Sequence, residues 1–143
     1  PVTVPKAGRG AAFADFDNDG DVDVLVSNVH DTPELYRLDQ RQPRTWAALQ
    51  LVGVASNRSA IGARVKLTAG GATQVGEVRG GGSYYSQNDV RVHFGIGGAA
   101  RVDRLEIRWP SGRTDALDAV AGGQVVTITE GIGITSRTPY AVP

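Results

Sequence analysis

The sequence lacks cysteine and methionine, and it has no apolar run long enough to cross a membrane as a helix. Without cysteine, disulfides and thiolate metal sites are excluded. The 15 basic and 15 acidic residues leave no net charge, which disfavours nucleic acid and anionic membranes as partners because both attract basic surfaces. Since the chain begins at Pro1 and contains no methionine, we expect a processed chain or a piece of a longer one.

Glycine is abundant, and valine and threonine recur in short runs between turn residues. This pattern predicts an all-β fold without a long helix. A chain of 143 residues is long enough for one domain with a small unit attached. We predict a first unit over residues 1–44 that ends in a polar linker at 40–44, a second β unit over 45–131, and a tail over 132–143 that is disordered or orders on a partner.

Strands are predicted where apolar and polar residues alternate or where β-branched residues cluster. The strand at 22–27 is apolar on both faces, which is typical of a strand enclosed between two layers. Residues 111–121 are predicted to be a connection built of turns, with at most one short helical turn. The predicted strands are residues 9–13, 22–27, 34–38, 46–52, 62–68, 73–79, 90–94, 104–109 and 125–129.

The most specific motif is an acidic loop with a carboxylate at every second position, at Asp15, Asp17, Asp19, Asp21 and Asp23. Alternate side chains of a tight loop can converge on one point, and oxygen ligands suit a hard cation such as Ca²⁺. We predict that Asp21 binds through its backbone carbonyl. The other four, Asp15, Asp17, Asp19 and Asp23, are predicted to bind through side-chain oxygens. The alternative is an acidic, solvated turn without a metal.

The motif is not that of a helical EF-hand, because Val26 stands at the twelfth position, where that loop needs a bidentate glutamate. Strand-forming residues flank the loop on both sides, so we expect it to join two strands. Residues 10–28 (GAAFADFDNDGDVDVLVSN) resemble an FG-GAP/VCBS repeat, the blade unit of integrin-type β-propellers. A closed propeller needs several blades, so the resemblance implies that the remaining blades, or another protein partner, cover this unit.

The second unit resembles the ASPIC/UnbV domain, which follows FG-GAP repeats in cartilage acidic protein and its bacterial relatives. The resemblance implies a secreted (extracellular or periplasmic), calcium-binding chain with no defined reaction. The fold we expect is one propeller-blade-like calcium hairpin followed by an antiparallel β-sandwich or barrel. The segments that carry this resemblance are residues 57–65 (NRSAIGARV), 78–87 (VRGGGSYYSQ), 93–97 (HFGIG) and 102–113, ending in WPSGR.

A glycine-rich loop followed by Tyr84, Tyr85 and Gln87 is a candidate ligand or partner loop. Tyrosines on loops are favoured contact residues, so a glycan or a peptide is a candidate ligand. The plain alternative is a turn with at least one tyrosine packed into the core. No lysine and helix follow the glycines, as a phosphate-binding loop would require.

Catalysis has little support in the sequence. His30 and His93 are the only histidines, no Gly-x-Ser-x-Gly elbow occurs, and no cysteine nucleophile is available. We therefore expect a non-enzymatic, structural, adhesive or protein-interaction module that binds calcium. The alternatives are a carbohydrate-binding module that uses the tyrosine loop and, less favoured, an accessory piece of a secreted hydrolase.

Overall fold

The computed structural model describes residues 5–39 and 45–139, and these form eleven strands and no helix. The all-β prediction is therefore confirmed, and the described chain contains no helix of the length and apolarity that a membrane span requires. The predicted linker at 40–44 lies outside the described residues. The strands are β1 (Gly8–Ala14), β2 (Asp23–Asn28), β3 (Glu34–Tyr36), β4 (Thr45–Val52), β5 (Arg64–Ala69), β6 (Ala72–Glu77), β7 (Val92–Gly97), β8 (Arg101–Arg108), β9 (Thr114–Ala121), β10 (Gln124–Thr129) and β11 (Gly133–Pro139).

The first unit is a three-stranded antiparallel sheet in the order β1-β2-β3. Its register places Ala12 opposite Leu25, and Leu25 opposite Leu35. Directly opposed residues share one face of a sheet, so these three side chains form an apolar stripe across all three strands. The acidic loop connects β1 to β2, as the flanking strand residues predict.

The second unit consists of two four-stranded sheets, in the orders β11-β10-β4-β7 and β6-β5-β8-β9. Their facing side chains alternate along the strands and form one core, in which Leu49, Leu67, Leu105 and Ile128 are fully buried. This arrangement is consistent with a β-sandwich. The barrel alternative is wrong, because neither sheet closes on itself. One pair also departs from the antiparallel expectation, since β4 and β10 run parallel.

Two segments that the sequence did not predict as strands pair with their neighbours. Residues 114–121 form β9 instead of a turn-rich connection, since β8 supplies a hydrogen-bonded edge that outweighs the weak strand propensity of Asp115, Ala116 and Asp118. Residues 133–139, which belong to the predicted tail at 132–143, form β11 against β10. Both are edge strands with largely exposed side chains, so they carry little of the alternation by which strands are recognised.

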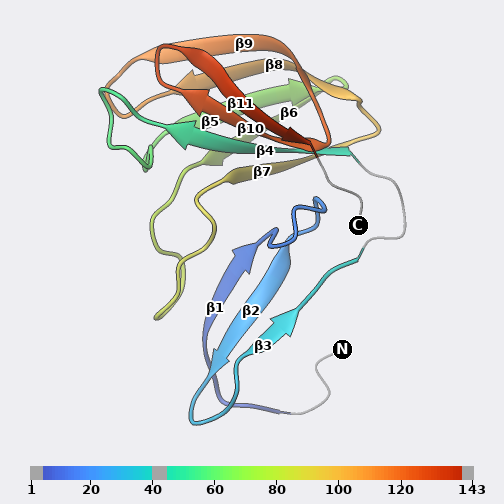
Figure 1. Cartoon of the computed structure of the whole chain (residues 1–143), viewed down its shortest axis with the longest axis vertical. Helices are drawn as coiled ribbons and strands as arrows, with labels where there is room; N and C mark the ends of the chain where they lie inside the picture. The colour runs from blue at the N-terminus through green and yellow to red at the C-terminus, as the bar shows by residue number, and fades with distance from the viewer. Residues whose placement is uncertain (1–4, 40–44, 140–143) are drawn as a thin grey trace.

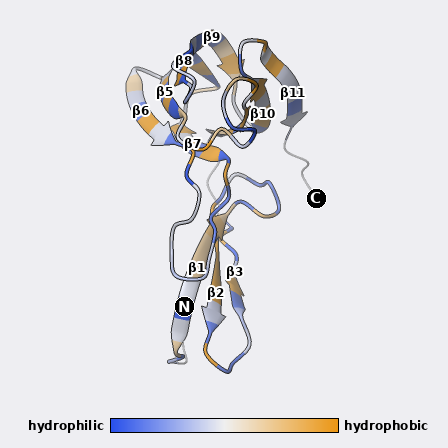
Figure 2. Ribbon diagram, turned by 90° about the vertical axis from the view of Figure 1, so that its left-hand side faces the viewer, coloured by the Kyte–Doolittle hydropathy of each residue, from blue (hydrophilic) through white to orange (hydrophobic). Residues whose placement is uncertain are grey.

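The three-stranded sheet projects from one side of the sandwich, as both ribbon views show (Figure 1, Figure 2). The connection between β6 and β7 extends from the sandwich alongside β1 (Figure 1). It covers the outer edge of β1 through three hydrogen bonds: Asp89 N–H to the Phe13 carbonyl (3.0 Å), Phe13 N–H to Asn88 Oδ1 (3.1 Å), and Ser86 Oγ–H to the Ala11 carbonyl (2.9 Å). An otherwise open sheet edge is thereby paired.

This contact requires a glycine in β1. A Cβ at Gly10 would lie 2.2 Å from the carbonyl oxygen of Tyr84, a distance that no side chain can adopt without a shift of the backbone. Gly10 therefore allows the β6–β7 connection to approach β1 closely.

The prediction that β2 is enclosed between two layers is wrong. The apolar run on β2 predicted enclosure between two layers, yet Leu25 is 47% exposed. Phe16, Leu35 and Leu38 are similarly exposed. In the described part of the chain the three-stranded sheet is separate from the two sheets of the sandwich, and Figure 2 shows it below them.

Candidate metal site at the junction of the two units

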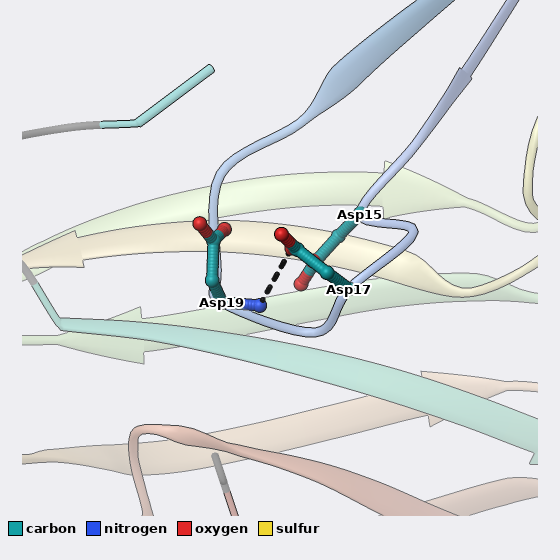
Figure 3. Close-up of side chains that lie close together, drawn as sticks. All are labelled: Asp15, Asp17 and Asp19. Atoms are coloured by element: carbon teal, nitrogen blue, oxygen red, sulfur yellow. Dashed lines mark hydrogen bonds between the residues drawn. The ribbon is translucent and has the colours of Figure 1, made fainter. Parts of the chain in front are cut away.

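The turn between β1 and β2 brings together the carboxylates of Asp15, Asp17 and Asp19, which each place one oxygen within 4.8 Å of the others. The Asp15 and Asp17 side chains point into the turn from one arm, and Asp19 stands on the other arm beside them (Figure 3). Of the five aspartates that the sequence nominates, these three form the cluster. Their convergence follows from the alternation of side chains around a tight loop.

Backbone hydrogen bonds hold the turn in this shape. Gly20 N–H donates to Asp15 Oδ2 (3.0 Å), Asp19 N–H to Asp17 Oδ1 (3.4 Å), and Asp21 N–H to Asp19 Oδ1 (2.8 Å). Asp15 is only 4% exposed, and its second oxygen, Oδ1, is buried without a hydrogen-bond partner. A buried carboxylate oxygen without a partner is costly, and an oxygen-seeking cation would satisfy it.

Asp23 is buried and has a different set of contacts. Its Oδ2 accepts a hydrogen bond from Phe16 N–H (3.2 Å), and its Oδ1 accepts one from Leu38 N–H (2.9 Å). These contacts tie the acidic loop to the segment that follows β3. In this arrangement Asp23 fixes the loop's shape, and Asp21 lies outside the cluster of three carboxylates.

Burial disfavours the ionised forms of Asp15 and Asp19. Desolvation by burial raises the pKa of Asp15 and of Asp19 above the ordinary value, and for Asp19 the neighbouring carboxylates raise it further. Arg37, which follows β3, pairs with Asp17 at 3.3 Å between Nε and Oδ2. The guanidinium thus supplies part of the positive charge that this cluster attracts.

Residues of the second unit contact the acidic loop from the side of the sandwich. Arg91, just before β7, donates from Nη2 to the Asp15 carbonyl (2.7 Å) and from Nη1 to Asn18 Oδ1 (2.5 Å). The indole of Trp46 on β4 lies against Gly20, where a Cβ would stand 1.9 Å from Trp46 Nε1. Trp46 opens the strand predicted at 46–52 and is buried, and the acidic loop is its neighbour here.

His93 of β7 stacks on Trp46, with ring centroids 5.8 Å apart. Its Nε2 is buried and has no hydrogen-bond partner, and desolvation lowers its pKa. It lines a cavity of about 190 Å³ together with Phe13, Asp15, Ala48 and Arg91. His30, by contrast, is exposed in the turn after β2, so the two histidines lie in different environments.

The predicted ligand loop is the β6–β7 connection that lies along β1. Gln87 shapes it, accepting from Gly81 N–H (2.6 Å) and donating to the Asn88 carbonyl (2.8 Å). Tyr84 and Tyr85 are both exposed and meet edge to face, with centroids 4.6 Å apart. The alternative in which a tyrosine packs into the core is therefore wrong. Tyr85 also has a positive φ of 51°, which is strained for a bulky residue.

A buried carboxylate in the second unit was not singled out from the sequence. Glu130, after β10, accepts three successive backbone N–H groups at Oε2, from Val54, Ala55 and Ser56 (2.7, 2.8 and 2.8 Å). Desolvation raises the pKa of Glu130, but these bonds and the hydroxyls of Ser56 and Ser111 outweigh it, so the pKa falls to about 2. No motif marks this residue, because its partners are mostly backbone groups.

The architecture defines a class of protein: a two-sheet β unit with a small three-stranded sheet attached, whose first turn carries an acidic cluster. The family profile described as ASPIC and UnbV matches residues 53–135, which span most of the two-sheet unit. The chain therefore belongs to the ASPIC and UnbV family. No curated protein matches the sequence significantly.

Proposed function

We propose that this chain is a calcium-binding, extracytoplasmic interaction module, in which the acidic loop binds one Ca²⁺ and thereby orders the three-stranded sheet. The observation that carries the proposal is the convergence of Asp15, Asp17 and Asp19 around the buried, unpartnered Oδ1 of Asp15. Hard oxygen donors of this kind are the ligands that Ca²⁺ takes. Resident Ca²⁺ would be held by these three residues, with the loop backbone nearby.

The role we propose for calcium is structural. A ligand that binds only the folded state stabilises it by RT ln(1 + [L]/Kd), or about 2.7 kcal/mol at a hundredfold excess over Kd. Extracellular calcium modules bind at about 10⁻⁴ to 10⁻³ M. Affinity in that range would fill the loop outside the cell or in the periplasm and leave it empty in a cytosol, so secretion is part of the proposal.

Thermal melts in chelator and across a calcium titration test this function. We expect the melting temperature of the native chain to rise with calcium and that of Asp17→Asn to stay flat. Asp118→Asn is the matched control, because it removes an exposed carboxylate on β9 that pairs with Arg104. It should respond to calcium as the native chain does. A native chain whose melting temperature ignores millimolar calcium would reject the proposal.

The second part of the proposal concerns the partner. The exposed face of the three-stranded sheet has a shallow hollow lined by Ala12, Ala14, Phe16, Asp23, Leu25 and Leu35. Small alanines beside leucines make a flat apolar surface, and sheets pack face to face by interdigitating such surfaces. We propose that the apolar face of another blade-like β-sheet covers it, in agreement with the resemblance of residues 10–28 to an FG-GAP/VCBS repeat.

In a solution of the isolated chain, the only such sheet available is that of a second copy. Sedimentation equilibrium should therefore show weak self-association, and Leu25→Lys should abolish it. Val75→Lys is the matched control, because Val75 is also an exposed apolar strand residue, on β6 of the sandwich. Equal association of the native chain and both variants would reject this surface.

A carbohydrate-binding function is the second candidate, and one observation favours it. Tyr85 is 87% exposed in a strained backbone conformation next to Tyr84, whose ring also lies 5.5 Å from the Arg9 guanidinium. Strained backbone conformations cluster at functional sites such as ligand clamps. A glycan array tests it: binding by the native chain that Tyr84→Ala removes would support the candidate, and an array without signal would reject it.

A further inference from the structure

We infer that the sandwich is part of the calcium site, with Arg91 as the positioning residue that couples metal binding to the packing of the two units. The inference rests on the proposed calcium function and adds to it a residue outside the loop that raises the calcium affinity. The Asp15 carbonyl and the Asn18 side chain both accept hydrogen bonds from outside the loop. Both are held by one guanidinium that belongs to the other unit.

The geometry of Arg91 suits this role. Its side chain is only 19% exposed, and its Nε pairs with Asp89, whose Oδ1 also accepts the Arg91 N–H (3.0 Å). With Nε so anchored, the two terminal nitrogens are aimed at the loop. A guanidinium presents several donors in a rigid fork, which a lysine ammonium cannot reproduce. The contact is therefore specific to arginine at this position.

The residue that Arg91 holds is itself in an unusual conformation. Asn18 has a φ of 60°, in the left-handed region that asparagine tolerates better than most residues. It stands between Asp17 and Asp19, so its backbone sets the direction of both carboxylates. A hydrogen bond to its Oδ1 therefore acts on the spacing of two of the three clustered oxygens.

Two further contacts bind the same loop to the sandwich. Gly20 lies against the indole of Trp46, and Asp89 N–H donates to the carbonyl of Phe13, near the end of β1. The loop thus lies between the strands that it joins and the wall formed by β4 and β7. Any change in the loop's shape on metal binding must be transmitted to these contacts.

Coupling between two equilibria is reciprocal. If the contacts of Arg91 strengthen calcium binding, calcium must strengthen the junction by the same factor. Partners of metal ligands typically change metal affinity by about 10- to 100-fold when they are altered. We therefore expect Arg91→Lys, which keeps the charge and loses the fork, to weaken calcium affinity by about tenfold.

Calorimetric calcium titration of the full chain measures this effect. Arg104→Lys is the matched control, because Arg104 pairs with Glu106 and Asp118 on the far sheet, and its affinity should equal that of the native chain. Hydrogen exchange provides the second readout. Saturating calcium should slow exchange of the Asp89 amide by about tenfold in the native chain, and by less in Arg91→Lys.

The outcomes separate this inference from the function on which it rests. Affinity of Arg91→Lys within twofold of native, with binding lost in Asp17→Asn, would overturn the coupling and leave the calcium site intact. No binding by the native chain would overturn both. If Arg91→Lys fails to fold, Asn18→Gly takes its place, because glycine readily adopts the positive φ and lacks the Oδ1 that accepts from Arg91. It too should bind about tenfold more weakly, and native affinity would contradict the inference.

Discussion

Replacement of Gly20 by alanine should destabilise the chain strongly, because two separate penalties meet at this position. The residue has a φ of +96°, where a Cβ costs about 1–2 kcal/mol. The new Cβ would also stand 1.9 Å from Trp46 Nε1 and 2.0 Å from Trp46 Cδ1. Overpacking against a fixed neighbour costs about 1–3 kcal/mol. We expect the free energy of unfolding to fall by about 2–5 kcal/mol.

Gly112 offers a control that isolates the backbone penalty. Its φ is +91°, close to that of Gly20, but a Cβ there would meet nothing within 4 Å. Gly112→Ala should therefore cost only about 1–2 kcal/mol. In a Trp46→Leu background the indole is gone, and the cost of Gly20→Ala should shrink toward that of Gly112→Ala, as a double-mutant cycle measures directly.

Urea unfolding in chelator, followed by far-ultraviolet circular dichroism, gives these free energies without a contribution from metal. The reasoning is refuted if Gly20→Ala and Gly112→Ala cost the same, since Trp46 would then exert no pressure on the loop. A cost that persists in the Trp46→Leu background would likewise show that the loop's contact with the sandwich is not responsible.

Three further predictions concern other parts of the molecule. The pKa of Glu130 in the folded chain is about 2, below its ordinary 4.5. Its ionised form therefore stabilises the fold above pH ~4.5, and this stability is lost as the pH falls toward 2. Glu130→Gln should flatten that part of the pH–stability curve, and an unchanged curve would contradict the role of Glu130. Leu105 is fully buried opposite Leu67 and Leu117. Leu105→Ala should lower the free energy of chemical unfolding by about 2–5 kcal/mol. A decrease below about 1 kcal/mol would show that Leu105 is not central to the core. Arg37→Gln should tighten calcium binding by roughly fivefold. It removes a cation that pairs with Asp17, and the attraction between two such charges is about 1 kcal/mol in a solvated setting. Weaker binding in calorimetry would contradict this and show that Arg37 supports the loop.

Local patterns predicted much of this fold because the signals were strong and short in range. The alternation along Arg64, Val65, Lys66 and Leu67 places β5 correctly, with its valine and leucine fully buried. The regular spacing of aspartates predicts the convergence of Asp15, Asp17 and Asp19, since side chains of a tight turn need no distant partner to meet.

The remaining features depend on pairing between distant segments. The strand β9 forms because β8 offers an edge, and β11 forms because β10 does, whereas their own exposed residues carry weak alternation. The sequence places Trp46 on the predicted strand 46–52 and Arg91 on the predicted strand 90–94, without indicating a partner for either. Their contact with the acidic loop spans dozens of residues, and only the packing of the two units reveals it.

The most direct test of the central claim is a crystal structure of the chain grown with millimolar calcium. We expect one density peak within 2.3–2.6 Å of oxygens from Asp15, Asp17 and Asp19, the range in which calcium takes its oxygen ligands, with Asp15 Oδ1 among them. A structure at the same calcium concentration in which these three carboxylates hold no ion, and Asp15 Oδ1 remains without a partner, would contradict the account.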